Sequence, residues 1–179
     1  NADTPEDAQR ALDFGAEGIG LFRIEHMFYG KNSEEPLAKL RNMILATNTE
    51  EREAALNELE PYILKAVKGT MKVMDGKPVT FRLMDPPLHE FVPQTEDKQR
   101  ELAKETGLPY EVIKSRIDAL HETNPMMGLR GVRLGIIYPE VTATQYRALF
   151  QATAELMKEG QNPQLEIMVP LTVNLAELQ

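Results

Sequence analysis

Short runs of β-forming residues alternate with longer amphipathic segments along this chain, and that alternation limits its possible folds more than any other feature. The expected strands are residues 18–22, 79–84, part of 126–131, and 165–171. The expected helices are residues 5–14, 34–47, 49–68, 95–106, 109–121 and 142–158. Strands separated by helices are typical of parallel sheets with crossover helices. The pattern predicts an α/β fold, and spacing alone allows either an open doubly wound sheet or a closed barrel.

Composition restricts the possible partners. The 28 acidic and 20 basic residues give a formal charge of −8, which disfavours nucleic acid and anionic membrane surfaces. A bound anion must therefore be held by locally placed cations. The chain has no cysteine, and it has no apolar stretch near the roughly 20 residues that a membrane span needs. We therefore expect one globular unit, residues 1–179, in a reducing cytoplasm.

Three arginines stand where expected strands end. Arg23, Arg82 and Arg130 each follow a short β-like run directly. In parallel α/β folds the ligand site lies at the carboxyl ends of the strands, so the three guanidinium groups could meet at one anion. The planar guanidinium suits phosphate or carboxylate because it donates two parallel hydrogen bonds. Any one of these arginines alone could instead cap a helix or pair with a carboxylate, but the set of three favours an anion site.

Other polar residues near these positions receive more modest predictions. Asp85 lies at a strand end beside Arg82 and could orient that arginine or contact a metal; orientation is the favoured role. Structural roles are expected for Glu25 with His26, for His89 with Glu90, and for His121. Glu25 and His26 would form a structural hydrogen-bonded pair. No metal-ligand spacing such as H-E-x-x-H occurs, so no metal site is expected within the chain.

Three motifs resemble those of the pyruvate phosphate dikinase family of phosphoenolpyruvate-utilising enzymes. They are GAEGIGLFRIEHMF at residues 15–28, RLMDPPLHEF at 82–91, and NPMMGLRGVRLG at 124–135. Ile24 departs from the family pattern, which has threonine there, and this puts a hydroxyl contact near Arg23 in doubt. Phosphoenolpyruvate synthase and the first enzyme of the sugar phosphotransferase system have related barrels, but the run from Asp85 to Glu90 favours the dikinases.

The resemblance implies a partial (β/α)8 barrel, about strands 2 to 5, with extra helices in the connections between strands and helices. It also implies that Arg23, Arg82 and Arg130 bind the phosphoryl group of phosphoenolpyruvate and offset charge during its transfer. The family uses magnesium, whose carboxylate ligands, like a catalytic cysteine, would lie beyond residue 179. A phosphohistidine domain and a nucleotide-binding domain would precede residue 1.

The resemblance implies a phosphotransferase that interconverts ATP, phosphate and pyruvate with AMP, diphosphate and phosphoenolpyruvate through a phosphohistidine. We interpret this chain as a piece of such an enzyme and expect it to be inactive alone. Open barrel edges would favour association with a second copy, so a homodimer is predicted. The alternatives are phosphoenolpyruvate synthase or another phosphoenolpyruvate-utilising barrel, and a non-catalytic interaction module that reuses half a barrel.

Overall fold

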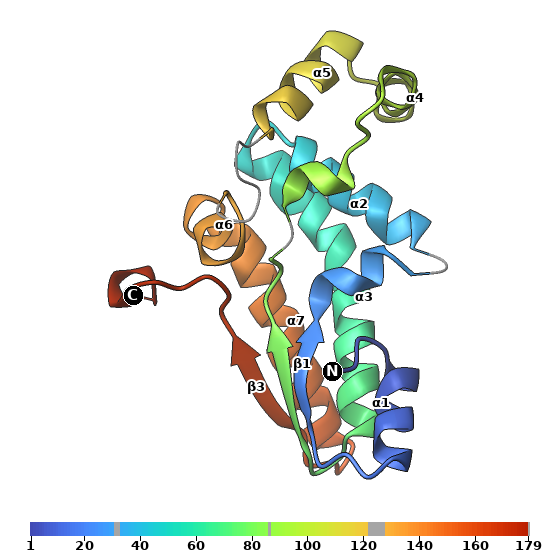
Figure 1. Cartoon of the computed structure of the whole chain (residues 1–179), viewed down its shortest axis with the longest axis vertical. Coiled ribbons are helices and arrows are strands. Elements are labelled where there is room, and N and C mark those ends of the chain that lie inside the picture. The colour runs from blue at the N-terminus through green and yellow to red at the C-terminus, as the bar shows by residue number, and fades with distance from the viewer. Residues whose placement is uncertain (31–32, 86, 122–127, 179) are drawn as a thin grey trace.

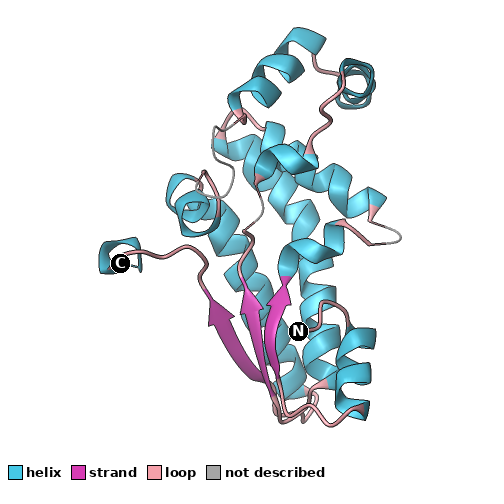
Figure 2. Cartoon of the chain, viewed as in Figure 1, coloured by secondary structure: helices cyan, strands magenta, loops and turns pink. Residues whose placement is uncertain are grey.

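A computed structural model describes residues 1–30, 33–85, 87–121 and 128–178, and its centre is a parallel sheet. The strands β1 (Ile19–Arg23), β2 (Pro78–Arg82) and β3 (Gln164–Met168) pair in the order β1-β2-β3, as Figure 2 shows. The α/β class predicted from the alternating pattern is confirmed.

Helices fill the connections between these strands. Helix α1 (Pro5–Asp13) precedes β1, and α2 (Glu34–Leu45) and α3 (Thr49–Val73) join β1 to β2. Between β2 and β3 the described residues form the helices α4 (Glu96–Thr106), α5 (Tyr110–Ala119), α6 (Gly131–Ile137) and α7 (Pro139–Lys158). Short 3-10 turns are η1 (Ile24–Phe28), η2 (Leu88–Phe91) and η3 (Leu175–Leu178). The predicted helices are all present, and α3 extends past residue 68 because Thr70 and Met71 still belong to its buried face.

The strand predicted within residues 126–131 is wrong for the part that the structure describes. Residues 126 and 127 lie outside the described residues, residues 128 and 129 form a bend, and Arg130 caps α6. Gly131 has a φ of 55°, and the backbone N–H of Val132 donates to the carbonyl of Pro170 at 2.9 Å. A left-handed residue at this point turns the chain into a helix, so the described sheet has three strands.

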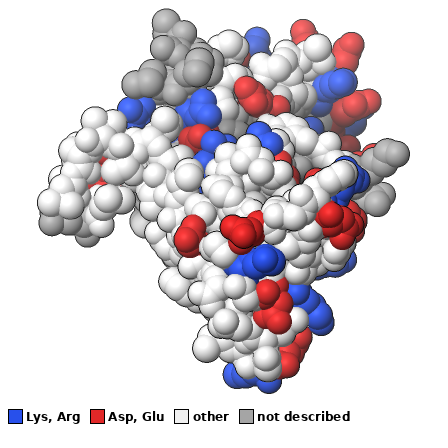
Figure 3. Space-filling model, turned by 60° about the horizontal axis from the view of Figure 1, so that its bottom comes forward, with Lys and Arg blue, Asp and Glu red and all other residues white. Residues whose placement is uncertain are grey.

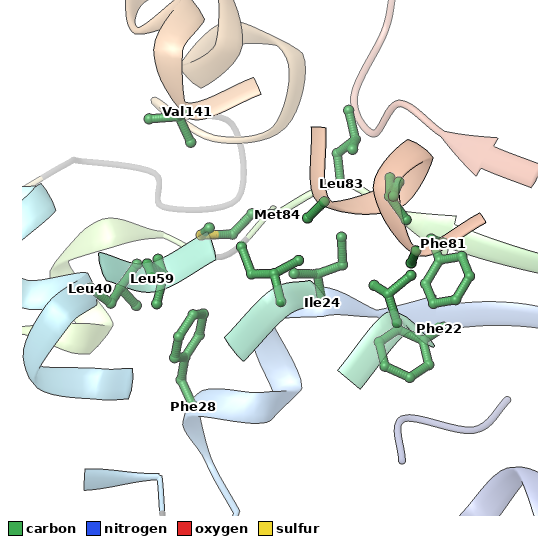
Figure 4. Close-up of a cluster of buried hydrophobic side chains, with 14 of the residues drawn as sticks. Phe22, Ile24, Phe28, Leu40, Leu59, Phe81, Leu83, Met84 and Val141 are labelled. Atoms are coloured by element: carbon green, nitrogen blue, oxygen red, sulfur yellow. The ribbon is translucent and has the colours of Figure 1, made fainter. Parts of the chain in front are cut away.

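One face of the sheet is buried and the other is open. Val79 and Phe81 are 0% exposed, and the rings of Phe22 and Phe81 pack with their centroids 4.8 Å apart. These side chains belong to the main core, part of which Figure 4 shows. Helices α3 and α7 lie against this side of the sheet (Figure 1). On the opposite face, the hydroxyl of Thr80 donates to Glu166 at 2.5 Å. Helices along a single face are consistent with a partial barrel wall, whereas an open doubly wound sheet has helices on both faces.

Helices α4 and α5 form a smaller unit at the end of the molecule farthest from the sheet (Figure 1). Its core is a separate cluster made of Leu45, Val92, Leu102, Ala103, Ile113 and Ile117. Extra helices were predicted in the connections between strands and helices, and this unit lies in the connection after β2, beyond the carboxyl ends of the strands.

Charges on the surface are mixed. Figure 3 shows Lys and Arg side chains interspersed with Asp and Glu over one face of the molecule. Among the described residues, none of the helices is both long and apolar enough to cross a membrane.

Candidate functional site

Arg23 and Arg82 lie side by side at the carboxyl edge of the sheet. They are register partners and the last residues of β1 and β2, so their side chains leave the same face of the sheet. Phe22 and Phe81, one position earlier, point into the core on the opposite face. The two guanidinium groups therefore stand on the open face, with 31% of the Arg23 side chain and 22% of the Arg82 side chain exposed.

Arg130 reaches the same edge from the start of α6. Its Nε donates to the backbone carbonyl of Asp85 at 2.7 Å and lies 3.3 Å from Oδ1 of the same residue. The Asp85 carboxylate, 5% exposed, also has Oδ2 at 3.6 Å from Nη1 of Arg82. Asp85 thus contacts Arg82, the residue it was predicted to orient, and connects it with Arg130. The structure gathers all three predicted arginines, although Arg130 does not follow a described strand.

Glu25 is a site residue that sequence reasoning set aside. Its carboxylate is 3% exposed, and its Oε1 accepts a hydrogen bond from Nη2 of Arg82. Within the described residues, Oε2 of Glu25 and Nε of Arg82 are buried without hydrogen-bond partners. Glu25 therefore holds Arg82 through one hydrogen bond and leaves other guanidinium donors unused. The predicted pairing of Glu25 with His26 is wrong, because each of them contacts another residue.

Asp3 holds Arg23. Its Oδ1 accepts from the backbone N–H of Arg23 at 2.9 Å and from Nε at 3.3 Å. Its Oδ2 accepts from Nη2 of Arg23 at 2.6 Å and lies 3.0 Å from Nδ1 of His26. Asp3 was not among the predicted site residues. The available signal was that Thr4 already caps α1 by accepting from Asp7, which leaves the neighbouring carboxylate for another role.

These contacts change the pKa values of both partners. Burial alone would raise the pKa of Asp3, but hydrogen bonds from Arg23 and the charge of nearby His26 bring it below 3.8. The hydrogen bond to Asp3 raises the pKa of Arg23. Asp3 therefore contributes stability that is complete above its ordinary pKa and is lost as pH falls through its lowered value.

We expect an NMR titration of the Asp3 carboxyl to give a pKa below 3.8. In Arg23→Ala the pKa of Asp3 is expected to rise, because the hydrogen bonds that lower it are lost while part of the burial remains. The titration of the variant serves as the matched control. The same pKa in both proteins, or a parent value above 3.8, would contradict the geometry.

Ile24, the departure from the family pattern, does not face the arginines. Its side chain is 1% exposed and packs in the core near Phe22 and Leu83 (Figure 4). The isoleucine therefore adds core contacts at this position, and the open face that carries Arg23 is unaffected.

Tyr29 joins the loops after β1 and β2. Its ring stacks on Phe91 with centroids 5.4 Å apart, and its hydroxyl donates to Glu90 at 3.5 Å. Burial, with the carboxylates of Glu90 and Glu25, raises the pKa of Tyr29 to about 12. These contacts fix η1 against η2 and so hold together the two loops that follow Arg23 and Arg82.

His89 and His121 stack on each other with ring centroids 5.9 Å apart, a structural contact outside the arginine cluster. Across the described ranges of the chain, His, Asp and Glu side chains nowhere gather in a group of three or more that could hold a metal. Carboxylates near the arginines are instead engaged in ion pairs.

Charge in the cluster is balanced by three carboxylates, which are Asp3, Glu25 and Asp85. An anion can bind only to guanidinium donors that these groups leave available. Within the described part of the chain, Nη1 of Arg23 and Nη1 of Arg82 make no hydrogen bond, and the latter lies 3.6 Å from Asp85. Paired arginines with such open edges can donate several hydrogen bonds to one phosphate or carboxylate.

The parallel sheet with helices along one face defines an α/β protein whose architecture is consistent with part of a barrel. Comparison with known families agrees. The model for the PEP-binding domain of PEP-utilising enzymes matches residues 1–179, and the chain belongs to this family.

Curated relatives resemble the whole chain. It is 49% identical over 180 residues to pyruvate, phosphate dikinase of Clostridium symbiosum, covering 100% of this chain and 20% of the relative. It is 51% identical over 180 residues to the chloroplastic pyruvate, phosphate dikinase of Mesembryanthemum crystallinum, covering 99% of this chain and 19% of the relative. It is 46% identical over 179 residues to pyruvate, phosphate dikinase of Giardia intestinalis, covering 100% of this chain and 20% of the relative. The chain thus spans about a fifth of the length of these relatives.

Proposed function

We propose that this chain is part of the phosphoenolpyruvate-binding barrel of a pyruvate phosphate dikinase and that Arg23, Arg82 and Arg130 bind the phosphoryl group of phosphoenolpyruvate. The observation that carries the proposal is the bridge that Asp85 makes between Arg82 and Arg130, beside the register pair of Arg82 with Arg23. The complete enzyme would interconvert ATP, phosphate and pyruvate with AMP, diphosphate and phosphoenolpyruvate through a phosphohistidine. The similarity to dikinases along the full chain supports this reaction over that of phosphoenolpyruvate synthase.

The arginines would act electrostatically. Phosphoryl transfer spreads negative charge over the equatorial oxygens of the transferred group, and fixed cations stabilise that charge without reorganising. Arg23 and Arg82 are well suited because paired strands hold their backbones in register. Asp85 fixes the position of Arg130 relative to Arg82 through its carbonyl and its carboxylate.

Other parts of the reaction would come from outside this chain. Magnesium would supply a further positive charge at the phosphoryl group, and the family resemblance implies that its carboxylate ligands lie elsewhere in the full-length protein. A phosphohistidine domain of the same polypeptide would deliver the phosphoryl group to the arginines. A homodimer and a cytoplasmic location stay predictions.

A second candidate is a non-catalytic interaction module in which the arginines are structural. The observation that favours it is that each arginine already has a carboxylate partner. Binding of phosphoenolpyruvate separates the two candidates, because purely structural ion pairs would leave no affinity for the ligand to lose.

Calorimetry with phosphoenolpyruvate on the full-length gene product tests the proposal. We expect Arg130→Ala to weaken binding by about tenfold or more, because one hydrogen-bonding charge on the phosphoryl group is lost. The matched control is Arg147→Ala, since Arg147 pairs with Glu60 on the exposed side of α7. Binding by Arg130→Ala that equals the parent, with both proteins folded, would favour the interaction module.

A further inference from the structure

Asp3 makes contacts that neither the anion site nor the start of α1 requires. One carboxylate accepts three hydrogen bonds from Arg23, through the backbone N–H, Nε and Nη2, and lies 3.0 Å from Nδ1 of His26. Only 15% of the Asp3 side chain is exposed, so these groups largely replace water around it. We name Asp3, Arg23 and His26 together the Asp3 cluster.

The Asp3 cluster determines which edge of Arg23 is available. Nε and Nη2 form one side of the guanidinium fork, and both donate to Asp3 at 3.3 and 2.6 Å. Nη1 lies on the other side of the fork, and no described residue accepts a hydrogen bond from it. Because the backbone N–H is held by the same carboxylate, the end of β1 and the guanidinium are fixed as one unit.

His26 completes the arrangement from the other side. Its Nδ1 lies 3.0 Å from Oδ2 of Asp3, the oxygen that also accepts from Nη2 of Arg23. The imidazole ring is itself oriented by an edge contact with Tyr29, with ring centroids 5.9 Å apart. His26 thereby restricts rotation of the carboxylate, which would otherwise be held by Arg23 alone.

We infer that Asp3 and His26 are positioning residues that aim Arg23 at the phosphoryl group, an inference that rests on the proposed function. Neither touches the substrate. Asp3 occupies one side of the Arg23 guanidinium and leaves Nη1 available, and His26 acts on Arg23 through Asp3. The long side chain of an arginine would otherwise sample several rotamers. A guanidinium that is not aligned with the phosphoryl group reduces substrate binding and the reaction rate, even where its charge is retained.

Variants of the full-length gene product test this inference, with calorimetric affinity for phosphoenolpyruvate and the steady-state kcat/KM as readouts. We expect Asp3→Asn and His26→Ala each to lower the affinity and the kcat/KM by about tenfold. His26→Asn is expected to recover most of the loss, because the asparagine amide can donate to Asp3 from a position close to that of Nδ1. The control is Asp7→Asn, which removes a charge from the same segment; the Asp7 carboxylate lies on the surface, 3.6 Å from Nη1 of Arg10.

A double-mutant cycle separates positioning from direct contact. In an Arg23→Ala background, Asp3→Asn is expected to cause no further loss, because Arg23 is the residue through which it acts. A further tenfold loss would overturn the inference. The inference would also be overturned if His26→Ala and Asp3→Asn both bound phosphoenolpyruvate with the affinity of the parent while Arg23→Ala bound it more weakly. If Arg23→Ala binds as the parent does, the proposed function fails instead.

Should Asp3→Asn not fold, the comparison of His26→Ala with His26→Asn decides, since neither alters a hydrogen bond of Arg23.

Discussion

Arg82→Lys is expected to lower kcat/KM for phosphoenolpyruvate by about a hundredfold while the protein stays folded. Lysine retains the charge beside Glu25 and Asp85, so neither buried carboxylate is left without a cation. It loses the planar fork, however, and an ammonium group cannot donate parallel hydrogen bonds to the phosphoryl oxygens while it also contacts Glu25. Steady-state kinetics of pyruvate formation from phosphoenolpyruvate by the full-length gene product measure the effect.

The lysine variant is more informative than alanine at this position. Arg82→Ala would leave Glu25 buried without its cation, which typically destabilises a protein by about 3–5 kcal/mol and would confuse a binding defect with unfolding. Arg100→Lys is the matched control, because Arg100 pairs with Glu96 on the exposed surface of α4. A kcat/KM for Arg82→Lys within a fewfold of the parent would show that the guanidinium fork does not bind the phosphoryl group.

Gly131→Ala is expected to destabilise the fold by about 1–3 kcal/mol and to weaken phosphoenolpyruvate binding as well. Gly131 has a φ of 55°, and an added Cβ would lie 2.7 Å from the carbonyl oxygen of Pro170 and 3.0 Å from Oδ1 of Asp85. The carbonyl belongs to the backbone that follows β3 and cannot move without shifting that segment. Displacement of Asp85 would also disturb both arginines that it contacts.

Gly20→Ala is the control for this prediction. Gly20 lies in β1 without a positive φ, and an added Cβ there meets nothing within 4 Å among the described residues. Chemical denaturation and calorimetry with phosphoenolpyruvate on both variants give the comparison. Equal stability and equal affinity for the two glycine variants would contradict the close approach of Gly131 to Asp85.

Local signals in the sequence were sufficient to predict most of the helices and strands. Helical spacing of apolar residues predicted a helix over residues 142–158, which lies within α7, and the helix expected over residues 5–14 matches α1. Arg23 and Arg82 could be placed together because the carboxyl ends of parallel strands meet at one edge of a sheet, whatever the detailed register. These features depend on neighbours along the chain or on a general rule of topology.

Ion pairs between distant residues could not be predicted in this way. Asp3 is 20 residues from Arg23, Glu25 is 57 from Arg82, and Asp85 is 45 from Arg130. Local periodicity carries no information about contacts at such separations, so Asp3 was overlooked and Glu25 was set aside.

The prediction of a strand at the beginning of α6 was wrong for a related reason. Its apolar residues and glycines resemble a strand and its exit loop. The left-handed Gly131 and the hydrogen bond from Val132 to Pro170 instead depend on the position of β3, more than thirty residues later. A tertiary contact therefore determined the local structure, and Arg130 reaches the site from a helix cap.

The most direct test of the account is a crystal structure of the full-length gene product with phosphoenolpyruvate bound. We predict that the phosphoryl oxygens lie within hydrogen-bonding distance of guanidinium nitrogens of Arg23, Arg82 and Arg130. Nη1 of Arg23 is expected to be one of the donors, with Asp3 still bound to the other side of that guanidinium. Phosphoenolpyruvate bound elsewhere, with the three arginines contacting only Asp3, Glu25 and Asp85, would contradict the account.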